Sequence, residues 1–246
     1  MRRPTWRDPL PWAAVIMLVL VFGLPSSGPI FAALFPQLDR PVYTRDPFWL
    51  LLLSHVELVA ASSAIATIVG VTCGVLVTRP IGASFRGMVE TLAGIGQAFP
   101  PVAVLAVAVP VLGFGALPAL IALALYGLLP VLENTVSGLG QVPQAIREAA
   151  VSTGMSGAQT LWNAELPAAA PVILAGVRTS VTINIGTAAL ASTVGAKSLG
   201  LPIIIGLNSE NVAYVIQGAL LVGALALTVD LAFGRLVEWS QRWKRL

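Results

Sequence analysis

The chain has 246 residues, of which 57% are hydrophobic and only 10% are charged. Soluble domains carry about 25% charged residues, so this composition excludes a soluble globular protein and indicates an integral membrane protein. The formal net charge of +3 is too small to indicate nucleic-acid binding, and one cysteine and one histidine exclude an intramolecular disulfide and a metal-ligand cluster.

Six stretches are apolar over a length that can cross a membrane, since a spanning helix needs about 20 apolar residues. They lie at approximately residues 11–34, 49–77, 88–112, 116–136, 168–194 and 212–236. We therefore expect an all-α, polytopic membrane bundle of about six transmembrane helices, forming a single transmembrane domain over residues 1–246. Residues 1–48 would supply an N-terminal span and a short structured external loop, and residues 49–238 the core.

The first span is interrupted by prolines, serines and a glycine at residues 25–29. The alternative interpretation is a cleaved signal peptide whose basic region is Arg2, Arg3 and Arg7. No convincing small-residue cleavage site follows at the usual distance, and apolar sequence resumes through Phe35. We therefore expect the first span to be retained.

The second span contains His55 near its outer end and two glycines, Gly70 and Gly74, four residues apart. We interpret the lone histidine as an anchoring or hydrogen-bonding residue rather than a ligand. Small residues at this spacing let helices approach closely, so Gly70 and Gly74 are predicted to lie at a helix contact.

The third span contains Gln97 and three prolines, of which Pro100 and Pro101 are adjacent. Each proline removes a helical hydrogen bond, so we expect this span to be kinked or broken. Transporters use such breaks at substrate pathways. Gln97, Pro100 and Pro101 are therefore translocation-path candidates, together with Asn184 on the polar face of the fifth span. The alternatives are an architectural kink and a polar face that bonds only neighbouring helices.

Basic residues set the expected orientation, because lysine and arginine favour the cytoplasmic side of a membrane. With the N-terminus inside, most of them fall inside or near that face: Arg2, Arg3, Arg7, Arg79, Arg86, Arg147, Arg235, Arg242, Lys244 and Arg245. Only Arg40, Arg45 and Lys197 fall outside. Both termini and the polar segment 143–167 are then cytoplasmic.

Arg178 lies within the fifth span by these boundaries, where an arginine should pair or reach toward the interface. We predict a structural ion pair with Glu133 or Glu90, both of which are expected near the same face.

The cytoplasmic polar segment is predicted to form two short helices around a turn. Pro143 suits the first position of a helix, and Gly154 stands where a left-handed residue ends one. Ser156 can cap the second helix. The pair Leu166-Pro167 predicts the end of that helix, because proline disfavours the α conformation in the residue before it.

Within this segment a Glu-Ala-Ala triplet is followed by a glycine and later by a Leu-Pro pair: Glu148, Ala149, Ala150, Gly154, Leu166 and Pro167. Their spacing resembles the EAA loop of ABC importer permeases, a cytoplasmic coupling element that docks on an ATPase subunit. One position departs from the pattern, because Ala164 stands where a branched apolar residue is usual. The resemblance assigns the six residues to ATPase coupling; the alternative is an ordinary loop between membrane helices.

Further stretches extend the resemblance over residues 55–238: PALIALALYGLLPVLENTVSGL, PVILAGVRTSVTINIGTAALASTVGA, and GL-N-G-AL-D spread over residues 206–230. They are similar to permeases of the osmoprotectant importers that move quaternary amines such as glycine betaine, choline and carnitine. Glu133 and Lys197 depart from that group, in which many members have a basic and a small residue at these positions.

The resemblance implies a type I ABC importer-like transmembrane domain that works by alternating access in a bacterial cytoplasmic (inner) membrane. Its implied partners are a dimer of ABC ATPase subunits, a second permease subunit (the same or homologous), a separate periplasmic or lipid-anchored solute-binding protein, and membrane lipid. The chain has no GxxxxGK[ST] phosphate loop. ATP and Mg²⁺ would therefore be bound by the partner ATPase, and this subunit would be a translocation subunit without cofactor, metal or catalytic residues.

Other interpretations stay open. One keeps the class and changes the cargo to methionine, a sulfonate or nitrate. An ion-coupled secondary transporter would need no ATPase, but the hydropathy shows no inverted repeat. A non-transporting membrane scaffold is disfavoured by the interrupted third span and the polar residues within the spans.

Overall fold

The computed structural model describes residues 8–241, and every regular element in this part of the chain is helical. Five helical runs are long and apolar enough to cross a membrane, and a broken pair of helices brings the number to six. They are Pro9–Ser26, Phe48–Val77, the pair Ala83–Ala98 and Pro101–Leu112, Ala116–Gly140, Gly157–Val194 and Val212–Ser240. The predicted all-α bundle is confirmed. The basic residues at both chain ends, which entered the predicted orientation, lie outside the described residues.

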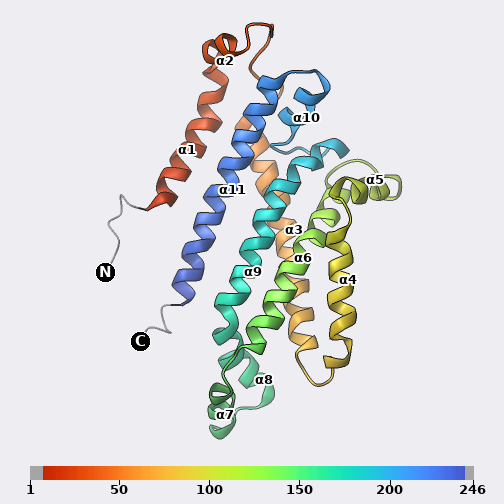
Figure 1. Ribbon diagram of the computed structural model, residues 1–246, viewed down its shortest axis with the longest axis vertical. Helices are drawn as coiled ribbons and strands as arrows, with labels where there is room; N and C mark the ends of the chain where they lie inside the picture. Colours follow the sequence, from red (N-terminus) through yellow and green to blue (C-terminus); the bar gives the residue numbers. More distant parts are fainter. Residues whose placement is uncertain (1–7, 242–246) are drawn as a thin grey trace. The chain divides into compact units, whose positions relative to one another are not determined.

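The described residues group into two compact units. The first contains the residues up to Ser62 together with residues 100–123 and 182–232, and the second contains residues 63–99, 124–181 and those from Phe233 onward. Four long helices contribute to both units: α3 (Phe48–Val77), α6 (Ala116–Gly140), α9 (Leu166–Thr187) and α11 (Val212–Ser240) (Figure 1). The single domain expected from the sequence stays a prediction.

The first unit begins with an interrupted span, as predicted. α1 (Pro9–Gly23) is followed by a 3-10 turn, Leu24–Ser26, and by α2 (Gly28–Leu34). Each of the three elements has a proline in its first turn, where the missing N–H costs no hydrogen bond. Proline placement thus divides this apolar stretch into separate helices.

The loop between α2 and α3 in the first unit is held by Gln217, a fully buried residue of α11. Its amide oxygen accepts the N–H of Tyr43 at 3.0 Å, and its amide nitrogen donates to the carbonyl of Pro41 at 2.7 Å. An ion pair of 3.1 Å joins Lys197 Nζ to Asp46 Oδ1 in the same region. The short structured loop predicted before the second span is confirmed.

His55 on α3 is fully buried and is hydrogen-bonded through both ring nitrogens. Nδ1 accepts the N–H of Leu199 at 3.2 Å, so Nε2 carries the proton and donates to the carbonyl of Ile185 at 3.1 Å. Ile185 lies where α9 gives way to the 3-10 helix Ala188–Val194, and Leu199 precedes α10 (Leu201–Asn208). His55 is therefore a hydrogen-bonding residue, as predicted.

The second unit adds five shorter elements to its parts of the long helices: the 3-10 turn Ala83–Phe85, α4 (Arg86–Ala98), α7 (Gln144–Ser152), α8 (Gly157–Thr160) and the π-helical turn Leu161–Glu165. Glycines bring its long helices close together. A Cβ at Gly70 or Gly74 of α3 would come within 2.9 or 2.7 Å of side chains on α6, and one at Gly176 of α9 within 2.6 Å of α6. The predicted helix contact at Gly70 and Gly74 is confirmed. The contact at Gly176 shows that α9 also packs closely against α6.

The third span is broken, as predicted, between α4 and α5 (Pro101–Leu112). Phe99 and Pro100 adopt extended backbone, with ψ angles of 137° and 135°, and Pro101 begins the new helix. The hydroxyl of Tyr126 donates to the carbonyl of Phe99. A carbonyl freed by the break is thus hydrogen-bonded by a side chain, which a break at membrane depth requires.

Gly176→Ala should destabilise the protein, because the added methyl group would meet the Pro130 carbonyl and the Asn134 side chain at 2.6 Å. We expect a loss of about 1–3 kcal/mol, the usual cost of overpacking, measured as a lower melting temperature in detergent. Gly223→Ala on α11 is the matched control, since nothing lies within 4 Å of its added methyl group. Equal melting temperatures would contradict the close packing of α6 and α9.

His55→Ala should also destabilise the protein, because the Leu199 N–H and the Ile185 carbonyl would lose their buried partner. An unsatisfied buried polar group costs about 1–3 kcal/mol, and the loss should appear in the same melting measurement. Glu57→Ala, at an exposed position on the same helix, is the control. A His55→Ala protein as stable as Glu57→Ala would show that these hydrogen bonds contribute nothing net.

Candidate functional site: the segment between α6 and α9

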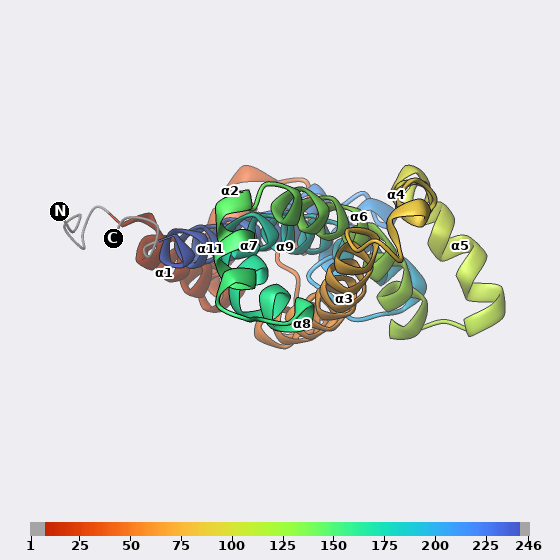
Figure 2. The same ribbon diagram turned by 90° about the horizontal axis from the view of Figure 1, so that it is seen from below.

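α7 and α8 occupy the polar segment 143–167, after the end of α6 and before α9 (Figure 1). Figure 2 shows these two short helices from below, the side on which α6 ends in Figure 1. Gly154 between them has φ of +80°, the left-handed conformation predicted for it. Ser156 caps α8 in a capping box with Gln159, also as predicted. Pro143 is the N-cap of α7, one position earlier than predicted, because its ψ of 137° is extended.

The prediction that Leu166 and Pro167 end the second short helix is wrong. α8 continues through a π-helical turn, Leu161–Glu165, directly into α9. Leu166 keeps helical dihedral angles, φ −62° and ψ −45°, although proline follows it. Hydrogen bonds in a π turn run over five residues instead of four, and the wider turn relieves the clash that a proline ring makes with the carbonyl four residues before it.

The six residues predicted for coupling divide between the surface and the interior of the second unit. Four are exposed: Glu148, Ala149, Gly154 and Pro167. Ala150 is buried, and Leu166 packs against a buried apolar cluster made of Leu139, Val142, Ala168 and Ala169. The segment therefore has an outer face of small and charged residues and an inner face fixed to α6 and α9.

Three large apolar side chains of the same segment are exposed as well: Val151, Met155 and Trp162 at 65%, 36% and 70%. Val151 lies in the last turn of α7, Met155 lies in the turn that follows, and Trp162 lies in the π-helical turn. Exposed apolar side chains grouped with polar ones are typical of protein interaction surfaces. These three side chains were not predicted from the sequence, because none of them stands at a position of the motif.

A buried carboxylate joins this segment to the ends of α3 and α6. It was not predicted from the sequence. Glu165, in the π-helical turn, is only 4% exposed. Its Oε1 accepts from Nε of Arg147 on α7 at 2.8 Å, and its Oε2 lies 2.7 Å from Nη1 of Arg79, just past the end of α3. Arg147 also donates from Nη2 to the carbonyl of Leu139, in the last turn of α6, at 2.7 Å. The only sequence feature that could have indicated this buried carboxylate is its position directly before the Leu-Pro pair.

The predicted ion pair of Arg178 with Glu133 or Glu90 stays a prediction. The Arg178 guanidinium lies beside Gly234 of α11, whose Cβ position would be 3.6 Å from Nη1. Gly176, two residues earlier, faces α6 instead, and two residues turn an α-helix through about 200°. Arg178 thus points away from the α6 contact. Glu133 of α6 is exposed, and Glu90 forms a 2.8 Å ion pair with Arg86.

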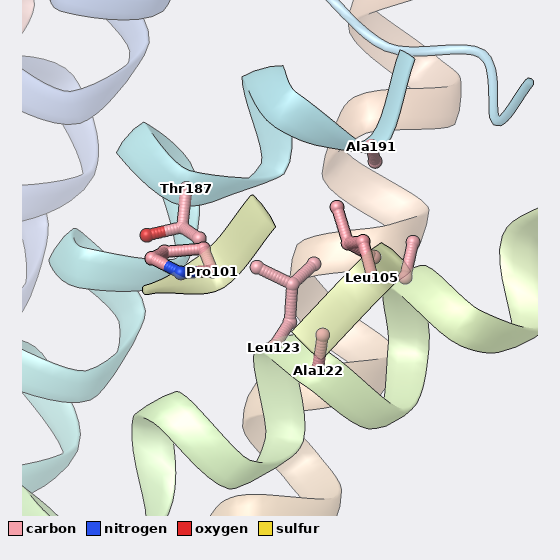
Figure 3. Close-up of a pocket in the computed structure, with 7 residues that line it drawn as sticks. Pro101, Leu105, Ala122, Leu123, Thr187 and Ala191 are labelled. Atoms are coloured by element: carbon pink, nitrogen blue, oxygen red, sulfur yellow. The ribbon is translucent and has the colours of Figure 1, made fainter. Parts of the chain in front are cut away.

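The translocation-path candidates have different surroundings. Pro101 lines a small pocket of the first unit with six other residues: Leu105, Ala119, Ala122, Leu123, Thr187 and Ala191 (Figure 3). Asn184 is fully buried and its amide nitrogen lies 3.4 Å from the Ser62 hydroxyl. Pro100 is exposed, and Gln97, in the second unit, is half-buried near the end of α4. Their role in a pathway stays a prediction.

No group of three or more histidine, cysteine, aspartate or glutamate side chains in residues 8–241 is placed to hold a metal ion. Together, the apolar spans and the exposed pair of short helices define a polytopic membrane protein with a segment suited to docking.

Comparison with known proteins then gives the family. Residues 66–245 match the family described as "Binding-protein-dependent transport system inner membrane component", and the chain belongs to this family.

Two relatives illustrate the similarity. The osmoprotectant import permease protein OsmY of Salmonella typhimurium is 41% identical over 188 residues, which is 76% of this chain and 78% of the relative. The choline transport system permease protein OpuBB of Bacillus subtilis is 41% identical over 170 residues, 67% of this chain and 78% of that one.

Two solved structures share the fold. An inward-facing structure of the MetNI methionine ABC transporter matches with a TM-score of 0.71 and 21% identity, covering 81% of this chain and 100% of the other. A crystal structure of an amino acid ABC transporter matches with a TM-score of 0.61 and 18% identity, covering 92% and 98%. At these identities the likeness concerns the fold alone.

Proposed function

We propose that the chain is the membrane-spanning permease subunit of an ATP-driven ABC importer for quaternary-amine osmoprotectants of the glycine betaine, choline and carnitine type. The observation that carries the proposal is the 41% identity to an osmoprotectant permease and to a choline permease over two thirds or more of this chain. Membership of a transport family supports the translocation role.

The exposed face of α7 and α8 supports docking of a separate ATPase. Ala149 and Gly154 carry little or no side chain, so a partner surface can approach their backbone closely. The three exposed apolar side chains of the segment add area to bury, and the exposed carboxylate of Glu148 adds a charge. ATP and Mg²⁺ would be bound by the ATPase, so this subunit would bind no cofactor and perform no hydrolysis.

The basic residues support a cytoplasmic location for the segment in a bacterial inner membrane. The second unit, which contains α7 and α8, holds four described arginines that the predicted orientation places inside or near the cytoplasmic face: Arg79, Arg86, Arg147 and Arg235. The first unit holds Arg40, Arg45 and Lys197. Because lysine and arginine favour the cytoplasmic side, the segment 143–167 is assigned to that side.

The complete transporter would contain two ATPase subunits, two permease subunits (identical or homologous) and a periplasmic or lipid-anchored solute-binding protein. We assign selection of the cargo to the binding protein, where an aromatic cage could recognise the quaternary ammonium group, and passage of the cargo to the permease pair.

Gly154→Asp should leave the protein inserted in the membrane but lower ATP-dependent uptake by roughly tenfold, a typical size for a lost coupling between sites. Any side chain is strained at φ +80°, and the new charge would face the docking partner. Gly140→Asp is the matched control: it is exposed, lies outside the segment, and has open space around it without positive φ. Normal ATP-dependent uptake by Gly154→Asp in proteoliposomes would refute the coupling role.

Labelled glycine betaine should accumulate in a host stripped of other osmolyte transporters when this chain is expressed with its neighbouring genes at high osmolarity. Choline and carnitine should compete with the label, and methionine should not. If the complex co-purifies with an ATPase but takes up no quaternary amine, the cargo is wrong and the permease role stands. If uptake stops with a protonophore while ATP is maintained, the ABC mechanism itself is wrong.

A further inference from the structure

We propose that Glu165 is a positioning residue that links α7 and α8 to α3, acting through an ion-pair cluster with Arg79 and Arg147. Glu165, Arg79 and Arg147 together form the Glu165 cluster. The proposal rests on the proposed function, in which an ATPase docks on α7 and α8. It concerns the step after docking, when displacement of these two helices must reach the membrane spans.

The polar segment 143–167, which contains α7 and α8, is joined by chain connectivity to only two spans. α7 follows α6, and α8 runs through the π-helical turn into α9 without a break. α3 is remote in sequence, and the Oε2 of Glu165, 2.7 Å from Nη1 of Arg79, reaches the residue just beyond its end. The Glu165 cluster thus gives the segment a direct ionic link to a third span.

The three members of the cluster are unequally exposed, which shows where it is anchored. The side chain of Glu165 is 5% exposed, against 29% for Arg79 and 41% for Arg147. A buried carboxylate has lost its hydration and depends on its partners, and removal of one partner of a buried ion pair is strongly unfavourable. Because it has two arginines, Glu165 remains paired when either one is removed.

The two arginines hold the carboxylate in different ways. Arg147 makes directed hydrogen bonds, from Nε to Glu165 at 2.8 Å and from Nη2 to the carbonyl of Leu139 at 2.7 Å. Arg79 is within ion-pair distance, but neither its Nε nor the Oε2 of Glu165 has a hydrogen-bond partner among the described residues. The Arg79 contact therefore depends on charge and distance, so a lysine at position 79 should replace much of it.

The π-helical turn gives Glu165 its inward direction. Leu161–Glu165 is wider than an α-helical turn, so the helix that follows is rotated relative to the one before. The exposed Trp162 and the buried Glu165 occupy the same turn. A force that a docked ATPase applies to the outer face of this turn therefore acts on the same turn that contains the buried Glu165.

The decisive variant is Arg79→Gln, because it removes the link to α3 while Glu165 stays paired with Arg147. Arg79→Lys should restore the charge at that position. Arg86→Gln is the matched control, since it breaks the Arg86–Glu90 ion pair of the same unit, which has a similar length, 2.8 Å against 2.7 Å, but more exposed side chains, 55% and 35%. Glu165→Gln tests the whole cluster, at the cost of leaving two arginines without their shared carboxylate.

The measurement is the ratio of labelled substrate transported to ATP hydrolysed by the complete transporter in proteoliposomes, together with the amount of ATPase that co-purifies with each variant. Arg79→Gln should retain wild-type binding of the ATPase while the ratio falls roughly fivefold or more, the size of a typical coupling between sites. Arg79→Lys should recover most of the ratio, and Arg86→Gln should leave it unchanged. A purely structural role for Arg79 would lower the yield or the melting temperature without changing the ratio.

An unchanged ratio in Arg79→Gln, beside a wild-type protein that couples normally, would overturn this proposal alone. A loss of ATPase binding in Arg79→Gln would also overturn it, because the cluster would then shape the docking surface instead of linking it to α3. If the wild-type chain captures no ATPase, the proposed function fails, and this proposal fails with it.

Discussion

Backbone groups that leave a regular helix inside a bilayer have no water to bond, and this protein satisfies such groups with buried side chains. Tyr126 donates to the carbonyl of Phe99 at the break of the third span. His55 serves one carbonyl and one N–H where α9 ends and α10 approaches. In the loop before α3, which is expected to lie outside the bilayer, Gln217 likewise bonds one N–H and one carbonyl. Much of the polar content of the spans is therefore structural, and a buried amide or imidazole here is weak evidence for a substrate pathway.

Close packing around α6 complements these hydrogen bonds in the second unit. Gly74 and Gly176 let α3 and α9 approach α6 to distances at which a Cβ would clash. Interiors packed in this way transmit displacement, because they switch between discrete arrangements and do not deform continuously. The segment of α7 and α8 is continuous with two of these three helices and is tied to the end of the third by Arg79. A force on the short helices is thus applied to a rigid group of spans.

The features that could be predicted from the sequence are those with a local cause. Gly154 adopts φ +80°, Ser156 caps its helix and the third span breaks before Pro101, because each follows from the backbone preferences of a few neighbouring residues. The continuation of α8 past Pro167 was missed, because a π-helical turn changes the local rule for proline. The partners of Glu165 could not be predicted either, since Arg79 is distant in sequence and nothing local distinguishes it from other basic residues near a helix end.

The ionic character of the link at Glu165 has a physical consequence that an apolar contact would not have. Replacing a buried ion pair by apolar side chains is often neutral or stabilising, so stability alone does not explain two arginines around one carboxylate. Directed hydrogen bonds hold Arg147 to both Glu165 and the end of α6, which fixes α7 in one orientation. The contact with Arg79 has charge and proximity without hydrogen-bond geometry, and a Coulomb attraction varies slowly with distance. The end of α3 is therefore attached by charge and proximity, whereas α7 is attached to the end of α6 by a directed hydrogen bond.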